Sequence, residues 1–200
     1  MPDTTIRAGE GGRVNYRMNN IYLVGFMGTG KTSVGKALSL KSNMRFVDLD
    51  DLIEFKEKRS IADIFAKDGE PYFRRAEKKI LKEVAKEKGF IVACGGGAVI
   101  DPENIKIMKE TGVIICLGAS SDAILKRTKG STCRPLLNVD NPKEKIEFLL
   151  KMRSPFYAKS DFLIDTSGLT IDKVVEKISK IGVLSENRPA KKKNTRLKRS

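Results

Sequence analysis

The sequence predicts an α/β protein of three layers, in which a parallel five-stranded sheet carries helices on both faces. The first observation is a set of five short, mostly apolar runs separated by stretches of helical periodicity: 20–26, 45–50, 90–94, 112–118 and 161–165. Near-continuous apolar runs are typical of parallel strands that are buried on both faces. The second observation is size, because 200 residues with 40% hydrophobic content suit one domain with a proper core.

The stretches between these runs predict the helices. A helix at 31–42 follows the first strand, and a long helical stretch over 51–89 follows the second. Within that stretch Ser60 and Asp63 could cap a new helix, and Gly69 interrupts the pattern. Three more helices are expected beside the last three strands: 101–111, which Asp101 and Pro102 begin, 120–128 and 169–181.

Composition divides the chain into a flexible extension at 1–19, a domain at 20–184 and a disordered basic tail at 185–200. The net charge is +14, and the final ENRPAKKKNTRLKRS holds seven Lys or Arg against one Glu. A solvated tail without a specific role is the first interpretation, and contact with nucleic acid or an acidic partner is the alternative. Inside the domain, residues 128–141 show no periodicity, and a loop that long is often a mobile lid.

The residue types narrow the chemistry and the compartment. Histidine is absent, so a general base must be a carboxylate or a lysine, and a metal must be held by oxygen ligands. No apolar run is long enough to span a membrane, and the first residues lack an apolar signal core. Cys94, Cys116 and Cys133 are odd in number and form no CxxC pattern, which favours a reduced cytoplasmic protein with buried thiols at the first two.

A glycine-rich segment follows the first strand. Residues 25–32, GFMGTGKT, match GxxxxGK[ST] between a strand and a helix, which is the context of a genuine phosphate-binding P-loop. Lys31 would reach the β- and γ-phosphates and the Thr32 hydroxyl would ligate Mg²⁺. Contacts with ATP or GTP are expected from six residues: Gly28, Thr29, Gly30, Lys31, Thr32 and Ser33. The chain is therefore expected to have a three-layer P-loop fold.

Two carboxylates follow in Asp48-Leu49-Asp50, which we expect to end the second strand. Residues two apart on an extended chain point the same way, so both can face the crevice at the strand ends. One could hold Mg²⁺ through water and the other could accept a proton from a substrate hydroxyl. A solvated pair or a helix cap is the alternative.

Basic residues follow on the helices and in the suspected lid. Arg74 and Glu77 are three apart and can pair, either as a surface salt bridge or as an oriented fork for a carboxylate ligand. Arg134 lies in the suspected lid, where a mobile arginine could close over a nucleotide. Arg153 lies on the helix that follows, and Arg127 could stack on an adenine ring.

Three consecutive glycines, Gly95, Gly96 and Gly97, follow the third strand. A tight strand-to-helix connection is one explanation. The other is that a ligand or another part of the chain comes very close to the backbone.

These motifs together resemble those of shikimate kinase, in the nucleoside-monophosphate-kinase branch of P-loop folds: GFMGTGKTSVG, DLD, FRRAE, CGGG, RPLL and RSPFY. The resemblance covers roughly residues 20–182 and neither tail. It implies transfer of the γ-phosphoryl group of MgATP to the 3-hydroxyl of shikimate, in chorismate and aromatic amino-acid biosynthesis. By the resemblance, Lys31 and Arg134 contact the phosphates, Asp50 is the base, and Asp48 holds Mg²⁺ through water beside Thr32.

For the acid substrate, the resemblance implies that Arg74 and Arg153 clamp the carboxylate and that Glu77 orients Arg74. The triple-glycine loop would lie against the small ring and offer backbone N–H groups. One departure is visible, because many relatives carry a proline near the adenine where this chain has DTSGLTIDK, 165–173. A monomer with small-molecule substrates and no membrane partner is expected. The alternatives are a gluconate or related sugar-acid kinase, and a nucleotide-binding interaction protein that uses the basic tail.

Overall fold

The computed structural model describes residues 19–129 and 139–184. Five strands form one parallel sheet in the order β2-β3-β1-β4-β5. Their bounds are β1 Asn20–Val24, β2 Arg45–Asp48, β3 Phe90–Ala93, β4 Gly112–Gly118 and β5 Phe162–Asp165. Because β1 lies between β3 and β4, the loops after these three strands meet at the carboxyl edge of the sheet, where open α/β folds bind ligands.

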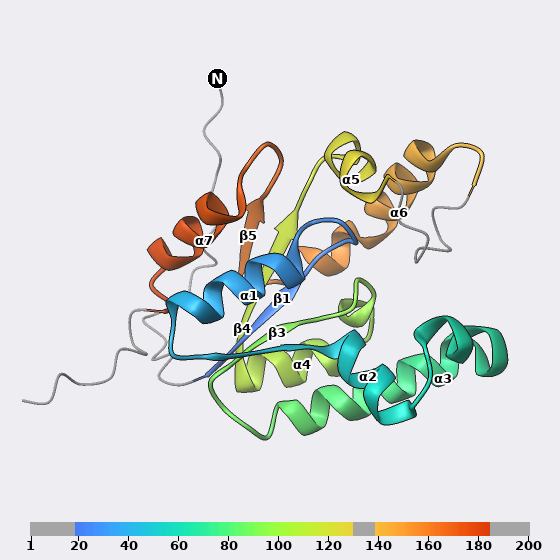
Figure 1. The fold of residues 1–200 in the computed structure, drawn as a ribbon, viewed down its shortest axis with the longest axis horizontal. Coiled ribbons are helices and arrows are strands. Elements are labelled where there is room, and N and C mark those ends of the chain that lie inside the picture. The colour runs from blue at the N-terminus through green and yellow to red at the C-terminus, as the bar shows by residue number, and fades with distance from the viewer. Residues whose placement is uncertain (1–18, 130–138, 185–200) are drawn as a thin grey trace, which may run out of the picture.

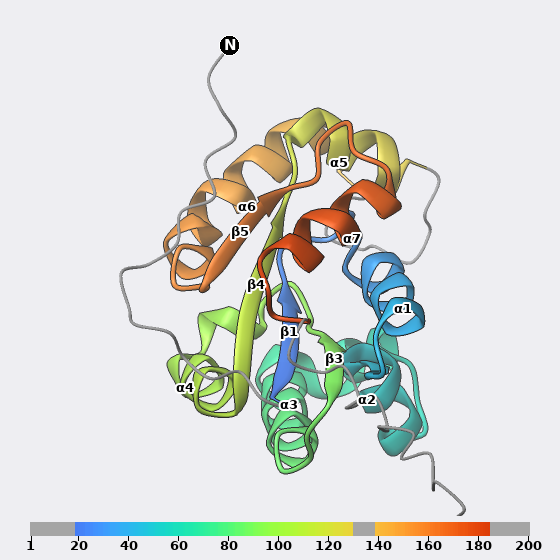
Figure 2. The same ribbon diagram turned by 90° about the vertical axis from the view of Figure 1, so that its left-hand side faces the viewer.

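Helices cover both faces of the sheet, as Figures 1 and 2 show. The α-helices are α1 Lys31–Lys41, α2 Leu49–Glu57, α3 Ile61–Val84, α4 Pro102–Thr111, α5 Ser121–Thr128, α6 Pro142–Tyr157 and α7 Ile171–Lys180, and a short 3₁₀ helix, η1, spans Ala98–Ile100. Helices α1 and α7 lie on one face, and α3 and α4 on the other (Figure 1). The predicted three-layer architecture is confirmed.

Alternation along β1 shows why both faces need a helical layer. Ile21 and Leu23 point into one core beside α1 and α7, whereas Tyr22 and Val24 point into the other beside α3 and α4. All four side chains are at most 1% exposed. A third, smaller cluster places Phe26, just after β1, against α5 and α6. The segment that follows β1 is therefore packed against α5 and α6.

The second strand is shorter than predicted, and the expectation that Asp50 lies on it is wrong. Strand β2 ends at Asp48, whose side chain accepts a hydrogen bond from the backbone N–H of Asp50 at 3.1 Å. A carboxylate in this position caps a helix, so α2 begins at Leu49 and Asp50 belongs to its first turn. The helix-cap alternative is therefore correct for Asp48, and the two carboxylates do not owe their proximity to strand alternation.

The long helical stretch predicted over 51–89 is two helices that end by Val84. Lys58 has a left-handed φ of 54° that ends α2, and the Ser60 side chain accepts from the Asp63 N–H to begin α3. The predicted cap and the predicted break are thus confirmed, since Gly69 has φ 75° inside α3. The break lets α3 turn before it reaches Arg74.

Several expectations concern residues outside the described ranges. The extension predicted at 1–19 and the tail predicted at 185–200 lie outside them, apart from Asn19, and so do Cys133 and residues 130–138 of the lid predicted at 128–141. Cys94 and Cys116 are buried free thiols, as expected. Within the described residues, no helix combines the length and apolar character needed to cross a membrane.

Candidate active site

The P-loop after β1 is shaped by glycines in conformations that other residues rarely adopt. Gly25, Gly28 and Gly30 have φ of 134°, 76° and 97°. A Cβ on Gly25 would also overlap with the carbonyl oxygen of Leu117 on β4. Gly30 is the N-cap of α1 and has no capping side chain, so the first N–H groups of that helix face the loop. This is the arrangement that binds phosphate.

Polar side chains hold the loop in this shape. The Lys31 ammonium donates to the carbonyl oxygens of Gly25 and Phe26, each at 3.0 Å. The buried Thr29 hydroxyl donates to Phe26 O at 2.7 Å, so this predicted phosphate contact has its side chain turned into the loop. Ser33, by contrast, is exposed on the first turn of α1.

Thr32 and Asp48 meet beside this loop, as the metal prediction requires. The Thr32 hydroxyl donates to Asp48 Oδ2 at 2.8 Å, and Asp48 Oδ1 accepts from the Asp50 N–H. A hydroxyl oxygen and a carboxylate oxygen in contact, next to the lysine of a P-loop, are hard donors of the type that Mg²⁺ prefers. The residues present therefore fit a Mg²⁺ ion bound with a nucleotide.

Asp50 is held in a demanding environment on the first turn of α2. Its Oδ1 is buried and has no hydrogen-bond partner among the described residues. Burial, and then the nearby carboxylates of Asp48 and Glu77, raise the pKa of Asp50 to about 6, while Lys31 opposes the shift. A carboxylate with its pKa close to neutral, and with a free oxygen, can accept a proton from a substrate hydroxyl.

Arg74 and Glu77 form a partly buried pair on α3, so the surface salt-bridge alternative is wrong. Arg74 Nη1 donates to Glu77 Oε2 at 2.7 Å, and Glu77 is 0% exposed. Burial raises the pKa of Glu77, and Arg74 counteracts this shift. Glu70 accepts from Arg74 Nε and Nη2 at 3.1 and 3.0 Å on the other side. Two carboxylates thus fix the plane of the guanidinium.

The triple-glycine loop after β3 lies against all the predicted acid-binding side chains. A Cβ on Gly95 would be 2.6 Å from Glu77 Oε1 and 3.1 Å from Asp50 Oδ1. A Cβ on Gly97 would overlap with the Arg74 guanidinium, whose Cζ would be 2.8 Å away. The protein's own side chains therefore explain the glycines at these two positions, even before a ligand is considered.

Gly96, between them, faces the P-loop and α6. Its position would place a Cβ 3.4 Å from both Arg153 Nη1 and Gly25 O, which is ordinary contact. Arg153 Nη1 also donates to the Gly96 carbonyl at 3.4 Å, and its guanidinium lies 5.5 Å from the centre of the Phe26 ring. The loop thus joins the nucleotide-binding P-loop to the arginine predicted to bind a carboxylate.

Tyr157, one turn after Arg153, was missed by sequence reasoning. Its hydroxyl donates to Gly96 O at 2.8 Å. The only sequence signal was its place in RSPFY, four residues after an arginine and so on the same side of a helix.

Arg127 ties the P-loop to the segment after β5. Its guanidinium donates to Thr166 O at 2.6 Å, to Thr166 Oγ1 at 3.0 Å and to Gly28 O at 3.3 Å. Thr166, 2% exposed, in turn donates to Thr29 O at 3.2 Å and to Gly118 O at 2.9 Å. Sequence reasoning missed Thr166, although a polar residue directly after a parallel strand is a useful signal. Arg127 thus lies beside the P-loop, its stacking on an adenine ring stays a prediction, and the predicted Arg134 lies outside the described residues.

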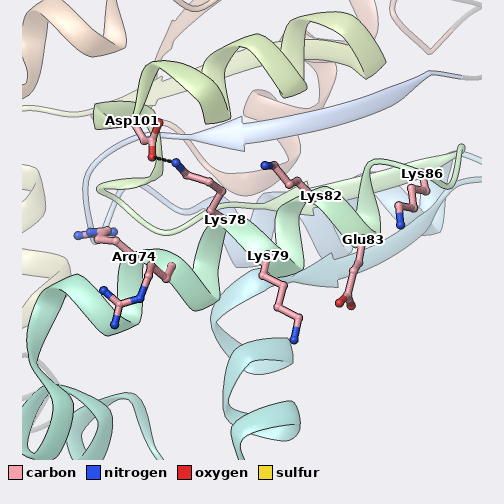
Figure 3. A pocket seen from close by; sticks show the side chains of 8 residues that line it. Arg74, Lys78, Lys79, Lys82, Glu83, Lys86 and Asp101 are labelled. Atoms are coloured by element: carbon pink, nitrogen blue, oxygen red, sulfur yellow. Dashed lines mark ion pairs between the residues drawn. The ribbon is translucent and has the colours of Figure 1, made fainter.

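A basic hollow of 510 Å³ runs along α3 away from Arg74 (Figure 3). It is lined by Arg74, Arg75, Lys78, Lys79, Lys82, Glu83, Lys86 and Asp101. Lys78 reaches Asp101 at the start of α4, at 2.6 Å (Figure 3). Lys79 and Lys86 take part in no ion pair with another described residue. Positive charge therefore continues from the site along the helix.

Comparison with known proteins agrees with the site. A family model described as shikimate kinase matches residues 27–181. A shikimate kinase of Thermodesulfovibrio yellowstonii is 50% identical over 163 residues, which cover 82% of this chain and 94% of that protein. One from Thermoanaerobacter pseudethanolicus is 47% identical, with 82% and 95% covered.

A solved structure is also similar. It is a shikimate kinase from Acinetobacter baumannii in complex with shikimate, with a TM-score of 0.80 and 36% identity, covering 86% of this chain and 97% of that one. With a family model that spans most of the chain and relatives of this identity, the chain belongs to the shikimate kinase family.

Proposed function

We propose that this protein transfers the γ-phosphoryl group of ATP to the 3-hydroxyl of shikimate, giving shikimate 3-phosphate and ADP. The reaction belongs to chorismate and aromatic amino-acid biosynthesis. The observation that carries the proposal is the convergence of Asp50, Arg74 and Arg153 on one glycine loop that also touches the P-loop. The site then brings together a base, a pair of cations that can bind a carboxylate, and a loop that can bind phosphate. The similar Acinetobacter baumannii enzyme, solved with shikimate, supports the same acceptor.

Arg74 and Arg153 would bind the acid. They approach the loop from different helices, α3 and α6, and each has its orientation fixed by protein oxygen atoms. Guanidinium groups that are already fixed lose little conformational entropy when they bind a carboxylate. Their planar shape also favours a planar anion over other ligands. The backbone of Gly95, Gly96 and Gly97 would lie against the small ring between them.

Asp50 would act on the acceptor hydroxyl. With its pKa at about 6, it is mostly ionised near neutral pH yet basic enough to take the proton as the hydroxyl attacks phosphorus. The carboxylate of Asp50, whose Oδ1 has no protein partner among the described residues, would receive the proton. The hydroxyl oxygen forms the new P–O bond, and the bond from the γ-phosphorus to the ADP oxygen breaks in line with it.

On the nucleotide side, the P-loop backbone and Lys31 would hold the phosphates, and Arg127 would border the adenine. Arg134 would neutralise the transferring group together with Lys31. Thr32 and Asp48 would hold Mg²⁺, which when bound offsets negative charge on the β- and γ-phosphates. Most of the rate enhancement would then come from positioning and charge stabilisation.

The setting of the enzyme is also part of the proposal. We infer a cytoplasmic monomer made of a flexible extension at 1–19, a catalytic domain at 20–184 with a lid at about 128–141, and a disordered basic tail at 185–200. Contact with nucleic acid through the tail is the less favoured alternative. Buried, unpaired Cys94 and Cys116 support a reducing compartment.

A coupled assay of ADP release tests the function. With MgATP, we expect turnover that depends on shikimate, while gluconate and a blank without acceptor give the same low rate. Turnover on gluconate instead would favour a sugar-acid kinase. ATP binding with no turnover on either acid would favour a nucleotide-binding interaction protein, and salt-dependent RNA binding lost on deletion of 185–200 would support that reading.

A further inference from the structure

Tyr157, the last residue of α6, has no role in the reaction outlined above. It is 8% exposed, and its hydroxyl donates to the Gly96 carbonyl at 2.8 Å. Arg153, one turn earlier on the same side of α6, donates to the same oxygen at 3.4 Å. Two donors from one helix therefore converge on a single carbonyl in the centre of the triple-glycine loop, and the tyrosine makes the shorter bond.

The planarity of the peptide carries this contact to the next residue. In a trans peptide, the carbonyl of Gly96 and the N–H of Gly97 lie in one plane and point in opposite directions. Because the carbonyl points to α6, the Gly97 N–H points away from α6. Among the described residues, this N–H has no hydrogen-bond partner. It is a free donor in a loop that also contacts Arg74.

The triple-glycine loop needs hydrogen bonds from other elements because its own residues do little to fix its backbone conformation. Three glycines have no side chains to restrict their backbone angles, so each can adopt many conformations. Nearby backbone hydrogen bonds, Ala98 N–H to Gly95 O and Ile100 N–H to Gly97 O, leave the central carbonyl of Gly96 without a backbone donor. Side chains from α6 provide the missing donors.

We propose that Tyr157 is a positioning residue for the acid substrate, because its hydroxyl fixes the Gly96–Gly97 peptide with the Gly97 N–H turned toward the substrate and gives Arg153 a fixed oxygen to rest against. This inference rests on the proposed function. It gives a role to a residue that would act on the acid through the triple-glycine loop and not by direct contact. Burial raises the pKa of Tyr157 to about 12, so the hydroxyl stays protonated and remains a donor at working pH.

Tyr157→Phe removes only the hydroxyl and tests the idea. We expect the KM for shikimate to rise about fivefold to twentyfold, since a mispositioned N–H and arginine weaken binding of the acid. The KM for ATP and kcat should change by less than about threefold, because the nucleotide side and Asp50 are untouched. A merely structural role would lower the melting temperature and leave the KM for shikimate unchanged.

Tyr22→Phe is the matched control. Tyr22 is also a buried tyrosine, at 0% exposure, and its hydroxyl is 2.7 Å from Thr111 Oγ1, at the opposite end of β1 from the P-loop. We expect it to lower thermal stability without moving either KM. An unchanged KM for shikimate in Tyr157→Phe, or an equal rise in both variants, would overturn the proposal.

An NMR measurement separates this inference from the proposed function. In ¹⁵N-labelled protein without ligands, Tyr157→Phe should shift the amide resonances of Gly96 and Gly97, and Tyr22→Phe should leave them in place. If the wild type fails to phosphorylate shikimate, the proposed function is wrong, but these resonances still test whether the Tyr157 hydroxyl fixes the Gly96–Gly97 peptide. Unmoved Gly96 and Gly97 signals in Tyr157→Phe would show that it does not.

Discussion

At the scale of single residues, Asp50 shows how an active site costs stability. An ionised carboxylate with a buried, unpartnered oxygen is unfavourable, and its pKa of about 6 records this. Because the folded-state pKa lies above the unfolded value of 3.8, the protonated form is favoured in the native state. The native protein therefore loses stability as pH rises from about 4 to 6, and the loss remains at higher pH.

Asp50→Asn should accordingly separate activity from stability. We expect kcat to fall at least about a thousandfold because the proposed proton acceptor is gone, while ATP binding stays measurable. The free energy of unfolding at pH 8 should rise by about 1–3 kcal/mol, with a smaller gain at pH 4, where the wild-type side chain is protonated. Steady-state kinetics and urea denaturation at the two pH values measure both effects.

Asp51→Asn is the control for that change, since Asp51 is an exposed neighbour on the same helix turn. It should alter neither quantity appreciably. In the wild type, kcat/KM should also decline below about pH 6 as Asp50 becomes protonated. Normal turnover by Asp50→Asn would remove Asp50 as the base.

At the scale of elements, the loop after β3 uses its three glycines for different reasons. Gly95 makes room for two carboxylates and Gly97 for a guanidinium, whereas Gly96 has ordinary space around its α-carbon. The loop is therefore more than a turn, because it lets α2, α3 and α6 bring charged groups to one place. Substitutions within it should not be equivalent.

Alanine substitutions test this difference. Gly97→Ala should displace Arg74 and raise the KM for shikimate by about tenfold to a hundredfold, the range expected for loss of a charge-assisted contact. Gly95→Ala should impair kcat as well, because its Cβ would press on Asp50 and Glu77. Gly96→Ala should fold with a melting temperature close to wild type and show the smallest kinetic defect. Three equal defects would instead indicate that the ligand alone requires the glycines.

Local sequence patterns predicted those features whose causes are local. The P-loop spacing, the Ser60 cap and the Gly69 break each depend on residues within a few positions, and all three were correct. The position of Asp50 was wrong, because alternation along a strand was assumed where the preceding Asp48 caps a helix. Helix capping by Asp48, which is also a local signal, therefore overrides the strand pattern at this point of the chain.

Contacts between distant segments could not be predicted in this way. Tyr157 meets Gly96 across 61 positions of the chain, and Thr166 meets Thr29 across 137. No periodicity or capping signal encodes such pairs, which depend on how the strands are ordered in the sheet. The resemblance to shikimate kinase implied that Arg74 and Arg153 clamp the acid, but the oxygen atoms that orient both guanidinium groups are seen only in the folded chain.

At the scale of the whole molecule, the net charge of +14 says little about the site until its distribution is known. Seven basic residues belong to the final fifteen positions, and others are paired, as Lys78 is with Asp101 and Glu103. At physiological ionic strength, exposed charges act over roughly 8 Å. Only unpaired cations within about that distance should affect an anionic substrate.

The basic hollow along α3 allows a graded test of this limit (Figure 3). With a rise of about 1.5 Å per residue, Lys79 lies about 7 Å along α3 from Arg74. The helix ends at Val84, about 15 Å from Arg74, and Lys86 lies beyond that end. Lys79→Gln should therefore raise the KM for shikimate by up to about twofold at low ionic strength, as expected for one charge acting through water over this range. Lys86→Gln should have almost no effect at physiological ionic strength. Repeating the kinetics in 0.5 M salt (about 4 Å screening) should abolish the Lys79 effect. A salt-independent change, or equal changes in both variants, would mean that the hollow acts by direct contact or not at all, rather than through its field.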